Sequence, residues 1–314
     1  MPVAPTSSPS SADSSSPIDL RRVRKLFAAP ERITESDFLR REIASRMHER
    51  LALVKIQPQR VLDAGCGEGA DLALLQGQYA DAQMLGCDAS LPLLQIARQR
   101  QATAMSSMNR LLSKWLPAKA SLGSAAGLLC GDFAQLPLKH AAVDLVWSNL
   151  ALHWHPQPDR VFAEWRRVLR VDGLLMFSCF GPDTFKEIRA AFAAADHAPH
   201  VLSFVDMHDF GDMLVNAGFS TPVMDMETIT VTYDSVDKLL ADVRAWGGNP
   251  LATRRRSLLG RQSWRKVTDV LESSRRADGK IPLTFEVVYG HAFRPTPTTT
   301  ASGEAIIRLD FRKP

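Results

Sequence analysis

The chain has 314 residues, of which 45% are hydrophobic and 23% charged, and its formal net charge is +4. This composition is ordinary for a globular protein and excludes a chain that is disordered throughout. No apolar run approaches the length of a membrane span, and the N-terminus lacks the apolar core of a secretory signal. The mild basic excess favours an acidic partner without indicating nucleic acid.

The four cysteines are Cys66, Cys87, Cys130 and Cys179. None of them belongs to a C-x-x-C pair, and each lies in or beside an apolar run. We therefore expect four reduced core thiols, which fits a protein of the reducing cytoplasm.

Both ends of the chain differ in composition from its middle. Residues 1–20 are rich in Ser and Pro, and we expect them to be disordered. Residues 293–314 are predicted to form a loose tail. Between them, residues 21–292 are predicted to form one domain, with an early helix from Asp37 to Leu53 whose apolar residues recur at helical spacing.

Strand-like and helical patterns then alternate along the chain. Strands are predicted at 60–64, 83–88, 128–130, 143–148 and 173–179, and helices at 69–78, 90–100 and 158–169. Residues 101–126 interrupt the alternation, and we expect a surface insertion with partial helix there. The alternation predicts an α/β, Rossmann-like fold, with a parallel sheet covered by helices on both faces.

Beyond residue 180 the pattern changes. Helices are predicted at 182–195, 206–217 and 235–246, and strands at 223–233 and 281–290. We expect residues 180–280 to form a helical lid that carries the substrate region. Pro282 suits the start or the edge of a strand.

The most informative motif is the run VLDAGCGEG at residues 61–69. It predicts a buried strand that ends in a glycine-rich turn and opens a helix, whose amides would point at a ligand. Asp63 stands directly before the glycines, and Asp88 ends the next apolar run. The glycine spacing differs from G-x-G-x-x-G, and no Lys-Ser/Thr pair follows, which argues against a dinucleotide turn and a P-loop.

These features resemble motif I of the class I S-adenosylmethionine (SAM) methyltransferases. The resemblance implies a seven-stranded sheet whose final strand is reversed, which the run from Ile281 matches. Asp132 and Phe133, after the third strand, resemble the adenine-binding motif of that class. The resemblance implies that SAM contacts Asp63, Gly65, Cys66, Gly67, Asp88, Ala89, Asp132, Phe133, Asn149 and Leu150.

The segment around the end of the fourth predicted strand should lie beside the transfer site, because ligands bind beyond the carboxyl ends of such strands. Asn149, His153 and Trp154 are the candidates there. His153 and His155 have no third ligand nearby in sequence, so no metal site is expected. No nucleophile–base pair is evident, which fits methylation of a carboxylate, since that nucleophile is already ionised at neutral pH.

A basic run extends from Arg254 to Lys280, with nine Arg and Lys residues against three Asp and Glu. The alternatives are a solvated helix face and a docking patch for an acidic protein. RNA is disfavoured, because Trp264 is the one aromatic residue in the run.

The chain more closely resembles the BioC-type malonyl-acyl carrier protein O-methyltransferases of biotin synthesis. The matching segments are VLDAGCG from Val61, DLVWSNLALHW from Asp144, RVLRVDG from Arg167 and GKIPLTF from Gly279. The resemblance implies methyl transfer from SAM to the free carboxylate of malonyl-acyl carrier protein, which would dock on the basic run. An Arg should pair with that carboxylate, and we choose Arg244.

Other segments resemble the mitochondrial complex I assembly proteins of methyltransferase fold. These are DFLRRE from Asp37 and GPDTFKEIR from Gly181. An assembly or modification factor for a respiratory protein therefore stays open, as does a SAM-binding scaffold without catalysis.

Overall fold

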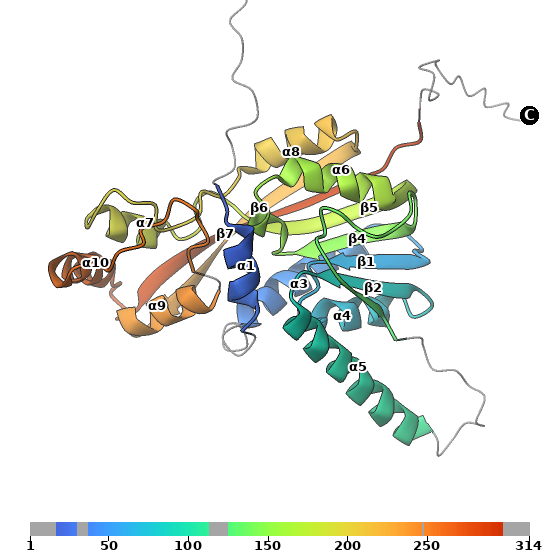
Figure 1. The fold of residues 1–314 in the computed structure, drawn as a ribbon, viewed down its shortest axis with the longest axis horizontal. Helices are drawn as coiled ribbons and strands as arrows, with labels where there is room; N and C mark the ends of the chain where they lie inside the picture. The colour runs from blue at the N-terminus through green and yellow to red at the C-terminus, as the bar shows by residue number, and fades with distance from the viewer. Residues whose placement is uncertain (1–16, 30–36, 113–124, 247, 298–314) are drawn as a thin grey trace, which may run out of the picture.

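The computed structural model of the chain describes residues 17–29, 37–112, 125–246 and 248–297. Within these residues the fold is organised around a seven-stranded sheet of order β3-β2-β1-β4-β5-β7-β6 (Figure 1). β1 to β5 are parallel to one another, whereas β7 is antiparallel to both β5 and β6. The predicted α/β class and the reversed final strand are confirmed.

The strands are β1 (Arg60–Ala64), β2 (Gln83–Asp88), β3 (Gly127–Cys130), β4 (Val143–Asn149), β5 (Leu169–Phe180), β6 (Ser220–Tyr233) and β7 (Ile281–Phe293). The helices are α1 (Leu20–Phe27), α3 (Asp37–Ala52), α4 (Ala70–Gln78), α5 (Leu91–Leu112), α6 (Pro158–Val168), α7 (Lys186–Ala193), α8 (Met207–Asn216), α9 (Val236–Ala245) and α10 (Arg261–Ser273). A short 3-10 turn, η2 (Leu152–Trp154), follows β4.

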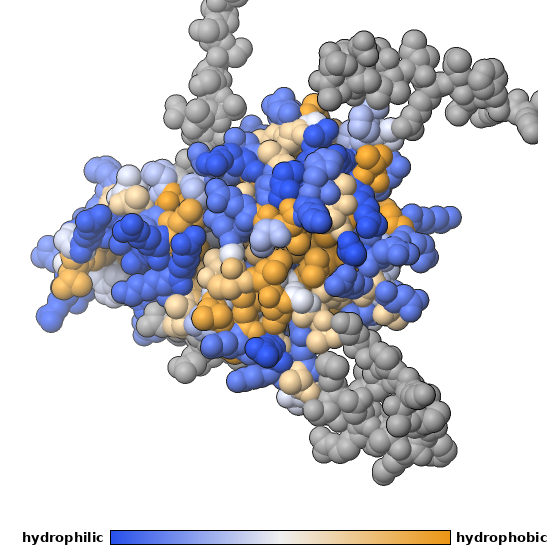
Figure 2. Space-filling model, turned by 45° about the vertical axis from the view of Figure 1, so that its right-hand side comes forward, coloured by the Kyte–Doolittle hydropathy of each residue, from blue (hydrophilic) through white to orange (hydrophobic). Residues whose placement is uncertain are grey.

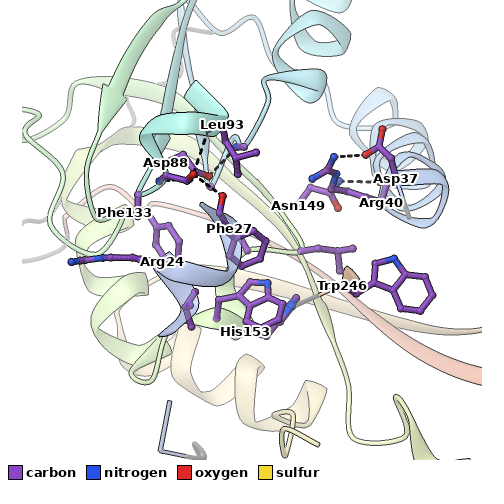
Figure 3. A pocket seen from close by; sticks show the side chains of 18 of the residues that line it. Arg24, Phe27, Asp37, Arg40, Asp88, Leu93, Phe133, Asn149, His153 and Trp246 are labelled. Carbon is purple, nitrogen blue, oxygen red and sulfur yellow. Dashed lines mark hydrogen bonds and ion pairs between the residues drawn. The ribbon is translucent and has the colours of Figure 1, made fainter. Parts of the chain in front are cut away.

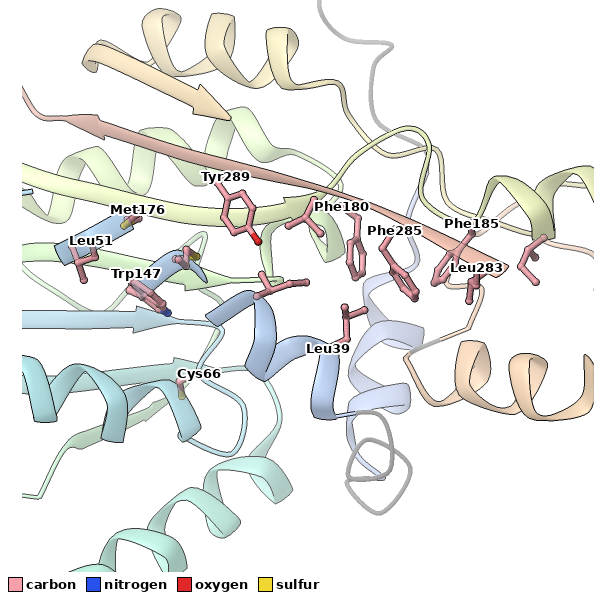
Figure 4. Close-up of a cluster of buried hydrophobic side chains, with 14 of the residues drawn as sticks. Leu39, Leu51, Cys66, Trp147, Met176, Phe180, Phe185, Leu283, Phe285 and Tyr289 are labelled. Carbon is pink, nitrogen blue, oxygen red and sulfur yellow. The ribbon is translucent and has the colours of Figure 1, made fainter. Parts of the chain in front are cut away.

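Two hydrophobic clusters cover the two faces of the sheet. Along β4, alternate side chains point to opposite faces: Leu145 and Trp147 enter the cluster that includes α3 and α4, while Val146 enters the cluster that includes α6 and α8. All three side chains are fully buried. Complete burial of one such side chain stabilises the fold by about 1.5–3 kcal/mol. Figure 4 shows Trp147 and Met176 in the first cluster, which continues to Phe285 beyond the end of β4.

The ribbon of β6 and β7 is longer than the rest of the sheet. β7 pairs with β5 only over residues 287–293, whereas it pairs with β6 as far as Ile281. The projecting part of this ribbon carries α7, α9 and α10, at the left of Figure 1. Leu283 and Phe285 on the ribbon share one buried cluster with Leu239 of α9 and Val267 of α10. The region predicted as a lid therefore packs directly on strands of the main sheet.

The structure also bears on the segments predicted to be irregular. α5 runs to Leu112, which is the partial helix expected in the insertion at 101–126, and residues 113–124 lie outside the described residues. Residues 17–20 of the predicted disordered segment are structured, since Ile18 pairs with Leu251 and α1 begins at Leu20. Residues 1–16, and 298–314 of the predicted tail, are not described.

One further difference concerns a cysteine. Cys130 is exposed, so it is not the core thiol that its apolar neighbours predicted. None of the helices in the described part of the chain combines the length and the apolar character that a membrane crossing requires.

Candidate active site

A cavity lies at the carboxyl ends of β1, β2 and β4 and is covered by α1 (Figure 3). Its wall contains backbone of the glycine-rich turn, the end of β2 and the segment after β4, as the doubly wound topology predicts. Of the predicted cofactor and transfer residues, those that line this cavity are Gly65, Gly67, Asp88, Ala89, Phe133, Asn149, Leu150, His153 and Trp154.

The glycine-rich turn has the backbone geometry that its sequence predicts. Gly65 has φ +86°, and a Cβ at this position would collide with the Cβ of Ala151. The amide of Gly67 donates to Asp88 Oδ2 at 2.9 Å, and the amide of Ser90 donates to Asp88 Oδ1 at 2.7 Å. Asp88 is thus held rigidly at the cavity, with lone pairs left on both oxygens for further donors.

Negative charge gathers behind the turn. Asp63 is buried, and its Oδ2 has no hydrogen-bond partner among the described residues. Burial, and then the carboxylates of Asp71 and Asp88, raise the pKa of Asp63 well above its ordinary value. Arg40 of α3 opposes this shift and lines the cavity. The site therefore has an unsatisfied buried acceptor and more carboxylates than cations, which fits a cationic ligand.

Of the predicted adenine-binding pair, only one residue lines the cavity. Phe133 lines the cavity, and its ring lies near the rings of His155 and Trp165. Asp132 is not among the lining residues: its Oδ1 accepts from the amide of Ala134 at 2.9 Å, and its Oδ2 lies 4.0 Å from Arg24. Asp132 therefore lies outside the lining, next to two residues that belong to it, Arg24 and Phe133.

Cys66 and Asp63 also lie outside the lining of the cavity. Cys66 packs in the core beneath the turn, and burial raises the pKa of its thiol well above the ordinary value. This thiol therefore stays protonated and acts as a packing group.

The segment after β4 is fixed by side-chain hydrogen bonds. Asn149 donates to the carbonyl of Arg40 at 3.2 Å and accepts from the hydroxyl of Ser178 at 2.8 Å. Leu150 has φ +51°, a conformation that is unfavourable for a branched side chain. Its amide is held by the Ser178 hydroxyl at 3.0 Å. Asn149 thus ties α3 and β5 to the end of β4, and it positions the wall of the cavity.

A second cavity adjoins the first on the side of α7, α9 and α10. Four residues line both cavities: His153, Trp154, Phe180 and Trp246. The second cavity is otherwise mostly apolar, with polar groups contributed by His200, Arg244 and Asn249. If each cavity held a ligand, the two ligands would therefore approach each other at this shared wall.

Arg244 lies on the lining of the second cavity, in the last turn of α9. Its side chain is exposed, and no carboxylate of the described residues forms an ion pair with it. The structure thus brings Arg244 to the second cavity and away from the glycine-rich turn.

The cover formed by α1 was not predicted. Val23, Arg24 and Phe27 line the first cavity, and the carbonyl of Phe27 accepts from the Ser90 hydroxyl at 2.8 Å. The Phe27 ring meets Trp154 edge-on at 5.2 Å. A short helix with an Asp N-cap was the available signal: Asp19 Oδ1 accepts from the amide of Arg22 at 3.2 Å.

Other cavity residues were also missed. Asp37, Leu39 and Arg40 come from the predicted early helix, and Trp246 follows α9. Among the described residues there is no group of three or more His, Cys, Asp or Glu side chains placed to hold a metal ion.

Comparison with known proteins bears on these observations. A family model described as a methyltransferase domain matches residues 62–177. The chain is 46% identical over 279 residues to a malonyl-[acyl-carrier protein] O-methyltransferase of Laribacter hongkongensis, covering 88% of this chain and 90% of that protein. It is 46% identical over 290 residues to the protein of the same name in Nitrosospira multiformis, covering 90% and 92%.

The fold also matches solved structures. The YcgJ protein of Bacillus subtilis superposes with a TM-score of 0.52 at 14% sequence identity, over 80% of this chain and 98% of that one. At this identity the match supports the fold alone. The methyl donor is S-adenosylmethionine, and the buried carboxylates of Asp63, Asp71 and Asp88 beside the glycine-rich turn fit its cationic groups. By the extent and identity of these matches, the chain belongs to the malonyl-[acyl-carrier protein] O-methyltransferase family.

Proposed function

We propose that this protein transfers a methyl group from SAM to the free carboxylate of malonyl-acyl carrier protein, as an early step of biotin synthesis in the cytoplasm. The observation that carries the proposal is the pair of adjoining cavities with a shared aromatic wall. A methyl group must pass directly from donor to acceptor, and the shared wall is where two bound ligands would meet. The names of the 46% identical relatives support the choice of acceptor.

The first cavity is proposed to hold SAM. Asp63, which lies behind the cavity lining formed by Gly65 and Gly67, is proposed to supply the unsatisfied acceptor for the cationic methionine end. Asp88, fixed by two backbone amides, is proposed to accept from the ribose hydroxyls. Asp132 and Phe133 are proposed to contact the adenine. For this contact the Asp132 side chain turns from its present position toward the cavity.

The acceptor chemistry matches the residues at the shared wall. A carboxylate is ionised at neutral pH, so its methylation needs no general base. The wall offers aromatic rings and His153, whose low pKa leaves it uncharged and a poor base. The contributions left to the protein are positioning of the two reactants and exclusion of water. Arg244, on the acceptor side and without an acidic partner, is proposed to pair with a negative group of the substrate.

Some of the cations in the proposed docking patch are already engaged in ion pairs within the chain. Within the run from Arg254 to Lys280, three cations already pair with carboxylates: Arg255 with Asp196, Arg275 with Glu272 and Lys280 with Asp234. The exposed cations for which no carboxylate partner occurs among the described residues are Arg256, Arg261, Arg265, Lys266 and Arg276.

Helix α10 connects this surface to the second cavity. Its Trp264 lines the cavity, while Arg261 and Arg265 are exposed to solvent. Leu258, just before the helix, is 93% exposed. Hydrophilic side chains cover this end of the molecule in Figure 2, whereas hydrophobic ones gather near the centre of the view. We propose that the acidic carrier docks on α10 and that its acyl arm enters the second cavity.

The first experiment follows methyl transfer by mass. Purified protein is mixed with labelled SAM and either malonyl- or acetyl-acyl carrier protein. The expected result is a gain of one methyl on the malonyl carrier and none on the acetyl carrier, which has no free carboxylate. Binding of SAM without transfer to the malonyl carrier would contradict the proposal and favour an assembly factor or a scaffold.

A second experiment tests docking. Reversing the charges of Arg261 and Arg265 to Glu should raise the KM for the malonyl carrier by about tenfold or more, because opposite charges steer and hold the partner. The affinity for SAM should stay unchanged. Arg98→Glu, an exposed position on α5 at the other end of the molecule, is the control. Equal KM values for the double variant and the control would contradict docking and indicate that the patch is only a solvated surface.

A further inference from the structure

His153 lies in the wall that the two cavities share, and Figure 3 shows it on the lining of the first cavity. It is the one titratable side chain of the four described residues that line both cavities. Its ring lies 5.0 Å from that of Trp154, 4.9 Å from Phe180 and 5.7 Å from Phe204. Its Nδ1 is buried and has no hydrogen-bond partner among the described residues.

An unpaired ring nitrogen at this place needs an explanation, because burying a polar atom without a partner destabilises the folded chain. Phe180 and Phe204 have no hydrogen-bonding side-chain group, and the indole of Trp154 has a donor but no acceptor. Because Nδ1 is itself buried, a ligand in either cavity would meet the other edge of the ring. It is the placement of the ring in the shared wall that assigns it to the reacting groups.

The charge state of the ring is set by the same surroundings. Burial lowers the pKa of His153 to about 3, with no contribution from a charged side chain among the described residues. At neutral pH the imidazole is uncharged and has one N–H donor.

We infer that His153 is a neutral hydrogen-bond donor to the acceptor carboxylate, holding one carboxylate oxygen while the other faces the methyl group. This inference rests on the proposed function and adds a role for one residue. In the step itself, a bond forms between the second oxygen and the methyl carbon, and the carbon–sulfur bond breaks with both electrons left on sulfur. The products are a methyl ester and a neutral thioether, and no proton moves.

A neutral donor suits this step better than a charged one. An imidazolium would repel the sulfonium of SAM, and it would also stabilise the carboxylate charge that has to attack. A neutral N–H orients the same oxygen and takes away less of its nucleophilic charge. The aromatic enclosure of His153 thus has a chemical purpose: it keeps a titratable ring uncharged at the point of transfer.

The test compares three variants of the full-length protein. His153→Phe keeps a planar ring and removes the donor. If the Phe variant fails to fold, His153→Leu is used in its place. His153→Asn and His153→Gln place a neutral amide near the positions of Nδ1 and Nε2, respectively. For each variant, kcat and KM for malonyl-acyl carrier protein, the SAM affinity and the pH profile are measured.

The expected result is a loss of about 10- to 100-fold in kcat/KM for the Phe variant, with the SAM affinity within about threefold of wild type. At least one amide variant should recover most of the loss, which a purely structural ring would not require. The wild-type profile of kcat/KM should show no inflection near pH 6.5, the ordinary histidine pKa.

Three outcomes would overturn the inference. They are a Phe variant as active as wild type, amide variants as impaired as the Phe variant, and an inflection near pH 6.5 that the Phe variant abolishes. Failure of the proposed function is distinguishable, because the wild-type protein itself would then transfer no methyl to the malonyl carrier.

Discussion

Replacement of Asp63 by Asn tests the electrostatics of the cofactor cavity. The buried carboxylate has an unpaired Oδ2, and its pKa is raised by burial and by Asp71 and Asp88. A group whose pKa is higher in the folded state than in the unfolded state favours folding at low pH. That contribution is lost as the pH rises through the folded-state pKa. Asn keeps the shape of Asp and does not titrate, so it should remove this pH-dependent term.

The size of the effect follows from the surroundings. An unsatisfied buried polar group costs about 1–3 kcal/mol, and a charged one costs more. Without ligand, the Asp63→Asn variant should therefore be more stable than wild type at pH 8 by roughly 1–3 kcal/mol, equivalent to about 2–4 °C per kcal/mol in Tm. The difference should shrink at pH 5, where the wild-type carboxyl is protonated more often.

The effect on the ligand has the opposite sign. Loss of a charged acceptor for the cationic end of SAM should weaken binding by about 1.5–3 kcal/mol, or roughly 10- to 100-fold. Wild-type affinity should also fall as the pH is lowered through the raised pKa of Asp63, and binding should release protons.

The assay combines thermal unfolding between pH 5 and 8 with titration calorimetry in two buffers of different ionisation enthalpy. Asp81→Asn, at an exposed position, is the matched control. A variant that is less stable than wild type at pH 8, or one that binds SAM as well as wild type does, would refute the assignment of Asp63 as the buried anion of the site.

Three further predictions concern separate parts of the molecule. Asp88→Ala removes the acceptor of the Gly67 amide and the proposed ribose contact, and it should abolish SAM binding; calorimetry that shows wild-type affinity would remove this assignment. Phe27→Ala opens the cover over the first cavity and should weaken SAM binding by about 2–3 kcal/mol at most while leaving Tm nearly unchanged, as measured by calorimetry and thermal unfolding. Gly290→Ala would force a Cβ into the buried ring of Phe177, so denaturant unfolding should show a loss of about 1–3 kcal/mol or more, and an unchanged midpoint would contradict the packing described here.

The main sheet could be predicted from the sequence because its signals are local. Strands buried on both faces appear as short apolar runs, and the glycine-rich turn follows from the backbone freedom of Gly65 and Gly67. The reversed β7 was predicted through the family resemblance, and its Pro282 lies where β7 pairs on one side only. These features depend on neighbouring residues in the chain, which a sequence displays directly.

The cover of the site could not be predicted in the same way. α1 has eight residues, which is too short to be stable alone, and it is held by distant partners. The amide of Asp19 donates to the carbonyl of Pro250 at 3.0 Å, and Arg22 donates to the carbonyl of Asn249 at 2.9 Å. Tertiary packing likewise brings Arg40 and Trp246 to the lining of the cavity and leaves Asp132 outside it.

The long β6–β7 ribbon has a consequence for dissecting the protein. The segment that matches the methyltransferase domain model, residues 62–177, ends within β5. In the folded chain, the edge of β5 that faces away from β4 pairs with β7, which comes more than one hundred residues later. A fragment cut after β5 would expose a long apolar edge, and such edges pair with other chains. The end of the matched segment is therefore no boundary for folding, and fragments of this enzyme should aggregate unless β7 is kept.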